Sequence, residues 1–325
     1  MTTPVICLGE CLVDRLFEVG RPAQGLKNYT DYPGGAPANV AAAIAKLGTP
    51  ARLISALGQD DRGDWLLQVL QDQGIDCQIQ RVEGAPTRTV LVQRDESGDR
   101  QFIGFSAPDP AAFADAFLAP DWIDTVDFSG VGYLVMGTLG LAYPATARAM
   151  ERARDKAQSA GTKIIIDLNW RPVFWPNQDI APQTIRAFLA AANLLKLSRE
   201  EALWLFNTDD AAEIGQQVPQ CQAVLLTDGG SGSTCATGHH SVTQPAFAVD
   251  SIDTTGAGDA FLAGVIHQLC QRGWDCLQQA DQIEQILRYA SAVGALTTLK
   301  PGAIAAQPTP EEIEAFLYLY AIAPR

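Results

Sequence analysis

The chain has 325 residues, 47% of them hydrophobic and 18% charged, so it can bury the core of one large α/β domain. Its formal net charge of −14 argues against nucleic acids and anionic membranes as partners, because both attract basic surfaces. It contains no basic leader and no apolar run of about 18 residues, and its seven cysteines are scattered without a CxxC pair. We therefore expect a cytoplasmic protein with no membrane helix and no zinc site.

Apolar, β-rich runs alternate with segments of helical periodicity over most of the chain. This alternation is typical of parallel βαβ units, so we predict one α/β domain that spans residues 1–325. The predicted strands are Val5–Leu8, Arg52–Ala56, Tyr133–Met136, Lys163–Asp167, Leu194–Leu197 and Ala223–Thr227. The predicted helices include Asn39–Lys46, Asp61–Gln73, Pro144–Ala160 and Arg199–Phe206.

Two regions interrupt this alternation. Arg15–Tyr32 has the pattern of extended chain with turns, and Thr87–Arg94 and Arg100–Phe105 flank the polar turn Glu96–Asp99 as the arms of a hairpin do. We expect these pieces to form a small antiparallel sheet. The functional interpretation is a lid over the active site, formed by about residues 15–33 and 86–106, and the alternative is a peripheral hairpin with no such role.

The last third of the chain is helical. Apolar residues recur at helical spacing from Phe261 to Leu269 and again from Ile283 to Gly294. We assign both stripes to the core and to nothing else.

The most informative stretch is Asp253-Thr254-Thr255-Gly256-Ala257-Gly258-Asp259, where small residues lead directly into a long amphipathic helix. The first N–H groups of a helix lack intrahelical partners and lie at the positive end of its dipole, so this turn can bind a phosphoryl group. Gly256, Ala257 and Gly258 form the predicted anion hole. Asp259 is the candidate base that accepts the proton of an attacking hydroxyl, and a plain helix-capping role is the alternative.

A second glycine-rich stretch, Gly34-Gly35-Ala36-Pro37-Ala38-Asn39, also enters a helix. Paired glycines let the backbone approach a ligand closely, and the Asn39 amide offers both donors and acceptors, which suits a polyol. An asparagine cap after a glycine turn is the simpler alternative.

Together the two stretches resemble the paired signatures of the PfkB, or ribokinase-like, family of carbohydrate kinases. The first stretch and Asp167-Leu168-Asn169-Trp170-Arg171-Pro172 are most similar to the fructokinase branch. The resemblance implies a ribokinase-like three-layer α/β/α sandwich with a mostly parallel central sheet and a small β-sheet lid. It further implies a kinase that uses ATP and Mg²⁺, that in many members binds K⁺, and that often forms a homodimer through the lid.

The resemblance also assigns roles to single residues. The positions matched to substrate binding are Asp14, Gly34, Gly35, Asn39, Asn169 and Arg171. Those matched to nucleotide and phosphate binding are Lys196, Glu201, Thr227, Gly229, Gly232 and Ser291. Asp253 and Thr255 match part of a monovalent-cation site.

Three positions depart from the family pattern. Gly104–Pro110 lacks the arginine that often follows the second lid strand, Ser198 replaces the asparagine of an Asn-x-x-Glu motif, and Ser291 replaces an asparagine near the adenine. The leading hypothesis is a fructokinase that phosphorylates D-fructose. The alternatives are another acceptor (2-keto-3-deoxygluconate, ribose or a nucleoside) or a non-catalytic, fructokinase-like interaction protein, which the intact Gly-Ala-Gly-Asp sequence disfavours.

Overall fold

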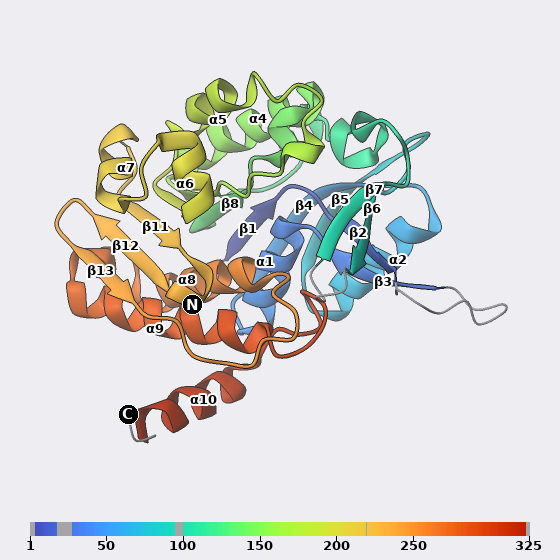
Figure 1. Ribbon diagram of the computed structural model, residues 1–325. Helices are drawn as coiled ribbons and strands as arrows, with labels where there is room; N and C mark the ends of the chain where they lie inside the picture. Colours follow the sequence, from blue (N-terminus) through green and yellow to red (C-terminus); the bar gives the residue numbers. More distant parts are fainter. Residues whose placement is uncertain (1–3, 18–27, 95–99, 219, 323–325) are drawn as a thin grey trace.

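The computed structural model describes residues 4–17, 28–94, 100–218 and 220–322, and its main feature is a large, mostly parallel sheet (Figure 1). The strand order is β13-β12-β11-β10-β9-β8-β1-β4-β5, and only the pairings of β12 with its two neighbours are antiparallel. The strands are β1 (Val5–Leu8), β4 (Ala51–Gly58), β5 (Asp76–Val82), β8 (Tyr133–Met136), β9 (Lys163–Asp167), β10 (Leu194–Ser198), β11 (Ala223–Thr227), β12 (Ser233–Thr237) and β13 (Ser241–Gln244).

Helices cover both faces of this sheet. In β1, Val5 and Cys7 point into one apolar core while Ile6 and Leu8 point into the other, because successive side chains of a strand alternate between faces. The first core is closed by α1 (Ala36–Lys46), α2 (Asp61–Asp72), α8 (Ala257–Arg272) and α9 (Ala280–Thr297), and the second by α4 (Pro144–Ala160), α5 (Ala181–Leu189), α6 (Arg199–Phe206) and α7 (Ala211–Gln217). The predicted three-layer α/β/α sandwich is therefore confirmed.

A second, smaller sheet lies beside the first and has the strand order β3-β2-β6-β7. Its strands are β2 (Leu12–Phe17), β3 (Tyr29–Gly34), β6 (Thr89–Arg94) and β7 (Arg100–Phe105). This confirms a separate small sheet built from the two predicted regions, although the turn Glu96–Asp99 and residues 18–27 lie outside the described residues. Two of its pairings are antiparallel, whereas β2 and β6 run parallel, because the whole β3-α1-β4-α2-β5 segment separates them along the chain.

Several element bounds differ from prediction by a few residues. Helix α1 begins at Ala36 and not at Asn39, because Pro37 falls in its first turn, where a missing N–H costs nothing and the fixed φ is already helical. Strand β4 runs on to Gly58, and α2 ends at Asp72, one residue early.

The remaining α-helices of the described residues are α3 (Pro120–Asp124) and α10 (Pro310–Ile322), and six short 3-10 helices lie in the connections. Figure 1 shows α10 on the outside of the molecule, next to α9. None of the helices described is both long enough and apolar enough to cross a membrane.

Candidate active site

The two glycine-rich stretches meet at the start of α8. Gly256 is the N-cap of this helix and adopts a φ of 77°, a left-handed conformation that favours glycine. A Cβ at Gly256 would also lie 2.6 Å from the Cβ of Ala303, so no larger residue fits there without a shift. The turn that opens the predicted anion hole therefore requires a glycine at position 256.

Asp259 lies in the first turn of α8 and contacts the other stretch directly. The Nδ2 atom of Asn39 donates a hydrogen bond of 2.8 Å to Oδ2 of Asp259, across 220 positions of sequence. Burial raises the pKa of Asp259, while the charge of Lys196 and this hydrogen bond act to lower it. The Oδ1 atom of Asn39 is buried and has no hydrogen-bond partner among the described residues, so it remains available to a ligand donor.

Lys196 brings a positive charge to the same point. It lies near the end of β10, and its Nζ atom is 2.9 and 3.1 Å from the two carboxylate oxygens of Asp167. A Cβ at Gly258 would lie 3.1 Å from this Nζ atom, so the ammonium group packs against the glycine of the anion hole. Burial acts to lower the pKa of Lys196, but the nearby carboxylates outweigh it and raise that pKa, so the lysine stays charged.

Asp14 lies against the glycine pair that precedes α1. A Cβ at Gly34 would lie 2.4 Å from Oδ2 of Asp14, so this carboxylate lies over the bare backbone. Gly35 adopts a φ of 101° and approaches the carbonyl oxygen of Glu10 so closely that a Cβ would lie 2.5 Å away. The neighbouring Ala36 N–H donates to the buried Glu10 carboxylate.

Glu10 was not predicted, and its burial raises its pKa from 4.5 to about 8. The sequence signal that could have found it is an acidic residue two positions after a fully apolar strand, with Gly9 between them.

Asn169 and Arg171 follow β9 at the carboxyl edge of the sheet. Asn169 has a φ of 41°, one of two described non-glycine residues with positive φ. Arg171 is exposed, donates to the Trp170 carbonyl, and contributes a charge that lowers the pKa of Asp259. Arg171 is therefore placed near Asp259, and both residues lie at the edge where open α/β sheets bind ligands.

Glu201 makes contacts that the sequence did not indicate. Its side chain accepts hydrogen bonds from the backbone N–H groups of Ser198 and Trp170, and the first bond completes a capping box at the start of α6. This carboxylate therefore holds the chain around Asn169 and Arg171, and the predicted role in phosphate binding stays a prediction.

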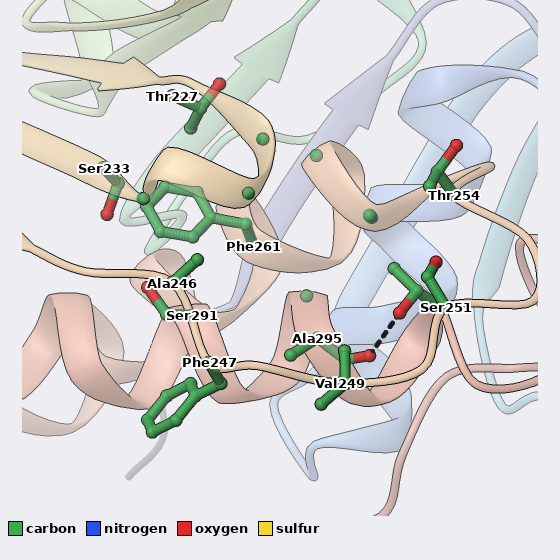
Figure 2. Close-up of a pocket in the computed structure, with 17 residues that line it drawn as sticks. Thr227, Ser233, Ala246, Phe247, Val249, Ser251, Thr254, Phe261, Ser291 and Ala295 are labelled. Atoms are coloured by element: carbon green, nitrogen blue, oxygen red, sulfur yellow. Dashed lines mark hydrogen bonds between the residues drawn. The ribbon is translucent and has the colours of Figure 1, made fainter.

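A pocket of about 400 Å³ opens beside the anion hole (Figure 2). Four residues predicted to bind the nucleotide line it: Thr227, Gly229, Gly232 and Ser291. Ala257 and Gly258 also line it, so the pocket leads to the start of α8 and towards Lys196 and Asp259.

Sequence reasoning missed much of this pocket. The lining also includes Phe261 and Gly294, which were assigned to the core alone, so that interpretation was incomplete. The other unpredicted lining residues are Gly230, Ser233, Ala246, Phe247, Val249, Ser251, Thr254, Ala295 and Thr298. The lining residues at the end of α9 could have been predicted from the sequence. Small residues recur there at helical spacing on one face: Ser291, Gly294, Ala295 and the C-cap Thr298.

The comparisons with known proteins agree with this geometry. Residues 2–310 match the family model described as pfkB family carbohydrate kinase. The chain belongs to the PfkB family of carbohydrate kinases. It is therefore a phosphotransferase that acts on a sugar hydroxyl, in a family that uses ATP.

Three similar proteins give this kinase a closer context. It is 32% identical to probable fructokinase-3 of Arabidopsis thaliana, over 97% of this chain and 91% of that protein. It is also 32% identical to the aminoimidazole riboside kinase of Salmonella typhimurium (strain LT2), over 91% of both. Among solved structures, a double mutant of the Vibrio cholerae O395 fructokinase in its fructose-, ADP- and potassium-bound form superposes with a TM-score of 0.85, at 29% identity, covering 97% of this chain and 98% of that one.

The predicted cation site of this kinase consists of backbone and a single carboxylate. Asp253 is buried, and its oxygens accept the backbone N–H groups of Thr255 (3.1 Å) and Gly302 (2.9 Å). Within the part of the chain that the structure describes, no group of three or more His, Cys, Asp or Glu side chains could hold a metal ion. A cation here would need carbonyl oxygens, which suit K⁺, whereas Mg²⁺ is commonly held by phosphates and one or two carboxylates.

Proposed function

We propose that this kinase transfers the γ-phosphate of ATP to the 6-hydroxyl of D-fructose, giving ADP and fructose 6-phosphate. The observation that carries the proposal is the meeting of Asp259, its partner Asn39 and the Lys196 ammonium at one end of a nucleotide-sized pocket. The fructokinase names of its relatives support fructose as the acceptor.

The site supports a direct transfer. The sugar would lie against Asp14 and the backbone of Gly34 and Gly35, with its reacting hydroxyl at Asp259. That carboxylate would take the hydroxyl proton as the oxygen attacks phosphorus, a step that contributes about 10²–10⁴-fold. Most of the remaining acceleration would come from positioning and charge, because phosphoryl transfer leaves a protein little covalent work.

The anion hole would stabilise the charge of the transferred group. The Gly258 N–H and the Lys196 ammonium would act together there, while the Ala257 N–H donates to the Thr254 carbonyl and so fixes the turn. Preorganised donors of this kind are worth about 3–4 kcal/mol each. A bound magnesium ion would neutralise further phosphate charge, and the backbone around Asp253 and Thr255 would hold K⁺ close to this turn.

The lid sheet would close over the sugar, since β2 carries Asp14 and β3 ends at Gly34. Closure would exclude water, which otherwise competes as the acceptor. We also propose a homodimer formed through this lid, and a cytoplasmic location.

The test is ADP release from MgATP over an acceptor panel of fructose, glucose, ribose, 2-keto-3-deoxygluconate, adenosine and aminoimidazole riboside, with and without K⁺. Aminoimidazole riboside belongs in the panel because the Salmonella kinase is as similar to this chain as the plant fructokinase is. Turnover with fructose at the highest kcat/KM supports the proposal. A higher kcat/KM with another acceptor keeps the mechanism and replaces the substrate, and no turnover with any acceptor favours a non-catalytic role.

A further inference from the structure

One wall of the pocket is formed by chain that is neither helix nor strand. Ala246, Phe247, Val249 and Ser251 line the pocket, and this segment runs from the end of β13 towards α8. An irregular segment lacks a regular ladder of backbone hydrogen bonds, so its position depends on what its side chains contact.

The ring of Phe247 is anchored outside the pocket. In Figure 2 it points away from Phe261 and Thr227, on the far side of its own segment. It meets the ring of Phe316 at 5.1 Å and that of Tyr320 at 4.8 Å between centroids, both edge-to-face. Phe316 and Tyr320 belong to α10, four residues apart on one face, and their own rings are 4.8 Å apart.

A hydrogen bond adds to this cluster, because the Tyr320 hydroxyl donates to the carbonyl oxygen of Ala248, next to Phe247. Tyr320 therefore holds the wall segment by both its ring and its hydroxyl.

Helix α10 is itself fixed to α9, along which the wall segment runs (Figure 2). Ile313 is fully buried in a cluster with Ala292 and Val293 of α9, the helix that carries the lining residues Ser291 and Gly294. The α10 helix thus links α9 to the wall segment, with Ile313 on α9 and its two aromatic rings on Phe247.

From these contacts we infer that Phe316 and Tyr320 are positioning residues for nucleotide binding: α10 sets the width of the pocket by holding the Phe247 segment against α9. The inference rests on the proposed use of this pocket by ATP. It places a determinant of nucleotide affinity on a helix that contributes no residue to the pocket lining.

The experiment compares Phe316→Ala and Tyr320→Ala with the matched control Tyr318→Ala. Tyr318 lies on the same helix but is 66% exposed, against 38% for Tyr320. We expect the two cluster variants to raise the KM for ATP and the calorimetric Kd for ADP by about 5- to 20-fold. This is the range expected from the loss of aromatic ring pairs and, in Tyr320→Ala, of one hydrogen bond as well. The kcat and the KM for the sugar should stay within about twofold of wild type, as should every constant of Tyr318→Ala.

The inference is overturned if the cluster variants match Tyr318→Ala. It is also overturned if kcat and the melting temperature fall while both KM values rise together, as a general loss of folding would cause. If the alanine variants are insoluble, Tyr320→Phe decides: it keeps the ring and removes the bond to Ala248, so an ADP Kd equal to wild type would overturn the inference. Failure of the proposed function is distinguishable: a different acceptor would leave ADP binding and this comparison unchanged, whereas a pocket that takes no nucleotide would show as a wild-type protein that binds no ADP.

Discussion

Asp259 and Asn39 show how a single contact can join two sequence motifs into one site. The amide of Asn39 holds Oδ2 of the aspartate at 2.8 Å. Its own Oδ1 is left without a partner among the described residues, so one side chain can orient the base and still meet a ligand donor.

The first prediction concerns this base. Asp259→Asn should lower kcat by about 10²–10⁴-fold, because the amide cannot take up the proton of the sugar hydroxyl. The KM for ATP should change little, and the melting temperature should not fall, because the variant removes a buried charge. Steady-state kinetics and thermal unfolding test both. Wild-type turnover by this variant would exclude Asp259 as the base.

The second prediction follows from the charges around Asp259. The carboxylate must be ionised to act, so kcat/KM should fall as the pH drops through its pKa, which burial places above the ordinary range of aspartate. Lys196 is the largest opposing influence, so removing its charge should move this acidic limb to higher pH. The double variant Asp167→Asn/Lys196→Met avoids leaving a buried carboxylate unpaired. Asp167→Asn alone serves as the control. If the acidic limb of kcat/KM lay at the same pH in wild type, Asp167→Asn and the double variant, the assignment of this limb to Asp259 would be contradicted.

The third prediction concerns Glu10, whose pKa is raised from 4.5 to about 8 by burial. Between these values the folded chain holds a proton that the unfolded chain has lost, so the free energy of unfolding decreases as the pH rises through this window. Glu10→Gln removes the effect and can still accept the Ala36 N–H. We expect the variant to be more stable than wild type by about 2–4 kcal/mol near pH 8, and the difference to vanish near pH 4. Urea unfolding at both pH values tests this, and an equal gain at both would reject it.

At the scale of elements, the bounds of strands and helices could be predicted where a local sequence pattern defines them. The bounds of β1, β8, β9 and α4 agree with the structure to the residue, because buried runs and proline starts define them. The pairing of β2 with β6 in parallel was beyond such reasoning, since it depends on how a long intervening segment folds.

The same division applies to the candidate site. The start of α8 could be predicted from the sequence because its turn needs a glycine: Gly256 has a positive φ, which residues with a side chain disfavour. The wall segment around Phe247 could not be predicted as part of the pocket, because it has neither a glycine pattern nor a helical or strand periodicity. Its place is set by contacts with α10, which follows it by more than sixty residues in the chain.

The fourth prediction belongs to the lid. If β2, β3, β6 and β7 close over the acceptor, amide hydrogen exchange in these strands should slow when fructose and a nucleotide analogue are added together. Helix α4, which covers the large sheet and is not part of the lid sheet, is the internal control and should not change. Unchanged exchange in the lid strands, with binding confirmed by calorimetry, would reject the lid assignment.

At the scale of the whole molecule, the positive charge at the predicted anion hole is opposite in sign to the net charge of the chain. The chain carries a formal charge of −14, yet Lys196 and the free end of α8 converge on one point. We therefore expect binding of a polyphosphate to rely on local dipoles and the buried Lys196 ammonium, and the net negative charge to disfavour polyanions such as nucleic acids.

The last prediction concerns assembly. Strand β7 is an edge of the small sheet, and it exposes 42% of Phe102 and 50% of Ile103. An open edge strand with large apolar side chains favours pairing with another chain unless something covers it. We therefore expect a homodimer through the lid, with twice the chain mass in light scattering, and expect Phe102→Asp/Ile103→Asp to be monomeric.

Its control is Ile180→Asp, which places the same charge on another exposed isoleucine, just before α5. This variant should remain dimeric, because the charge lies away from the sheet edge. If the dimer covers the lid, the monomeric variant should also show a higher KM for the sugar, since Asp14 and Gly34 lie on strands of that same sheet. A monomeric wild type, or a dimer that survives the double substitution, would remove the lid from the interface and leave sugar binding to a single chain.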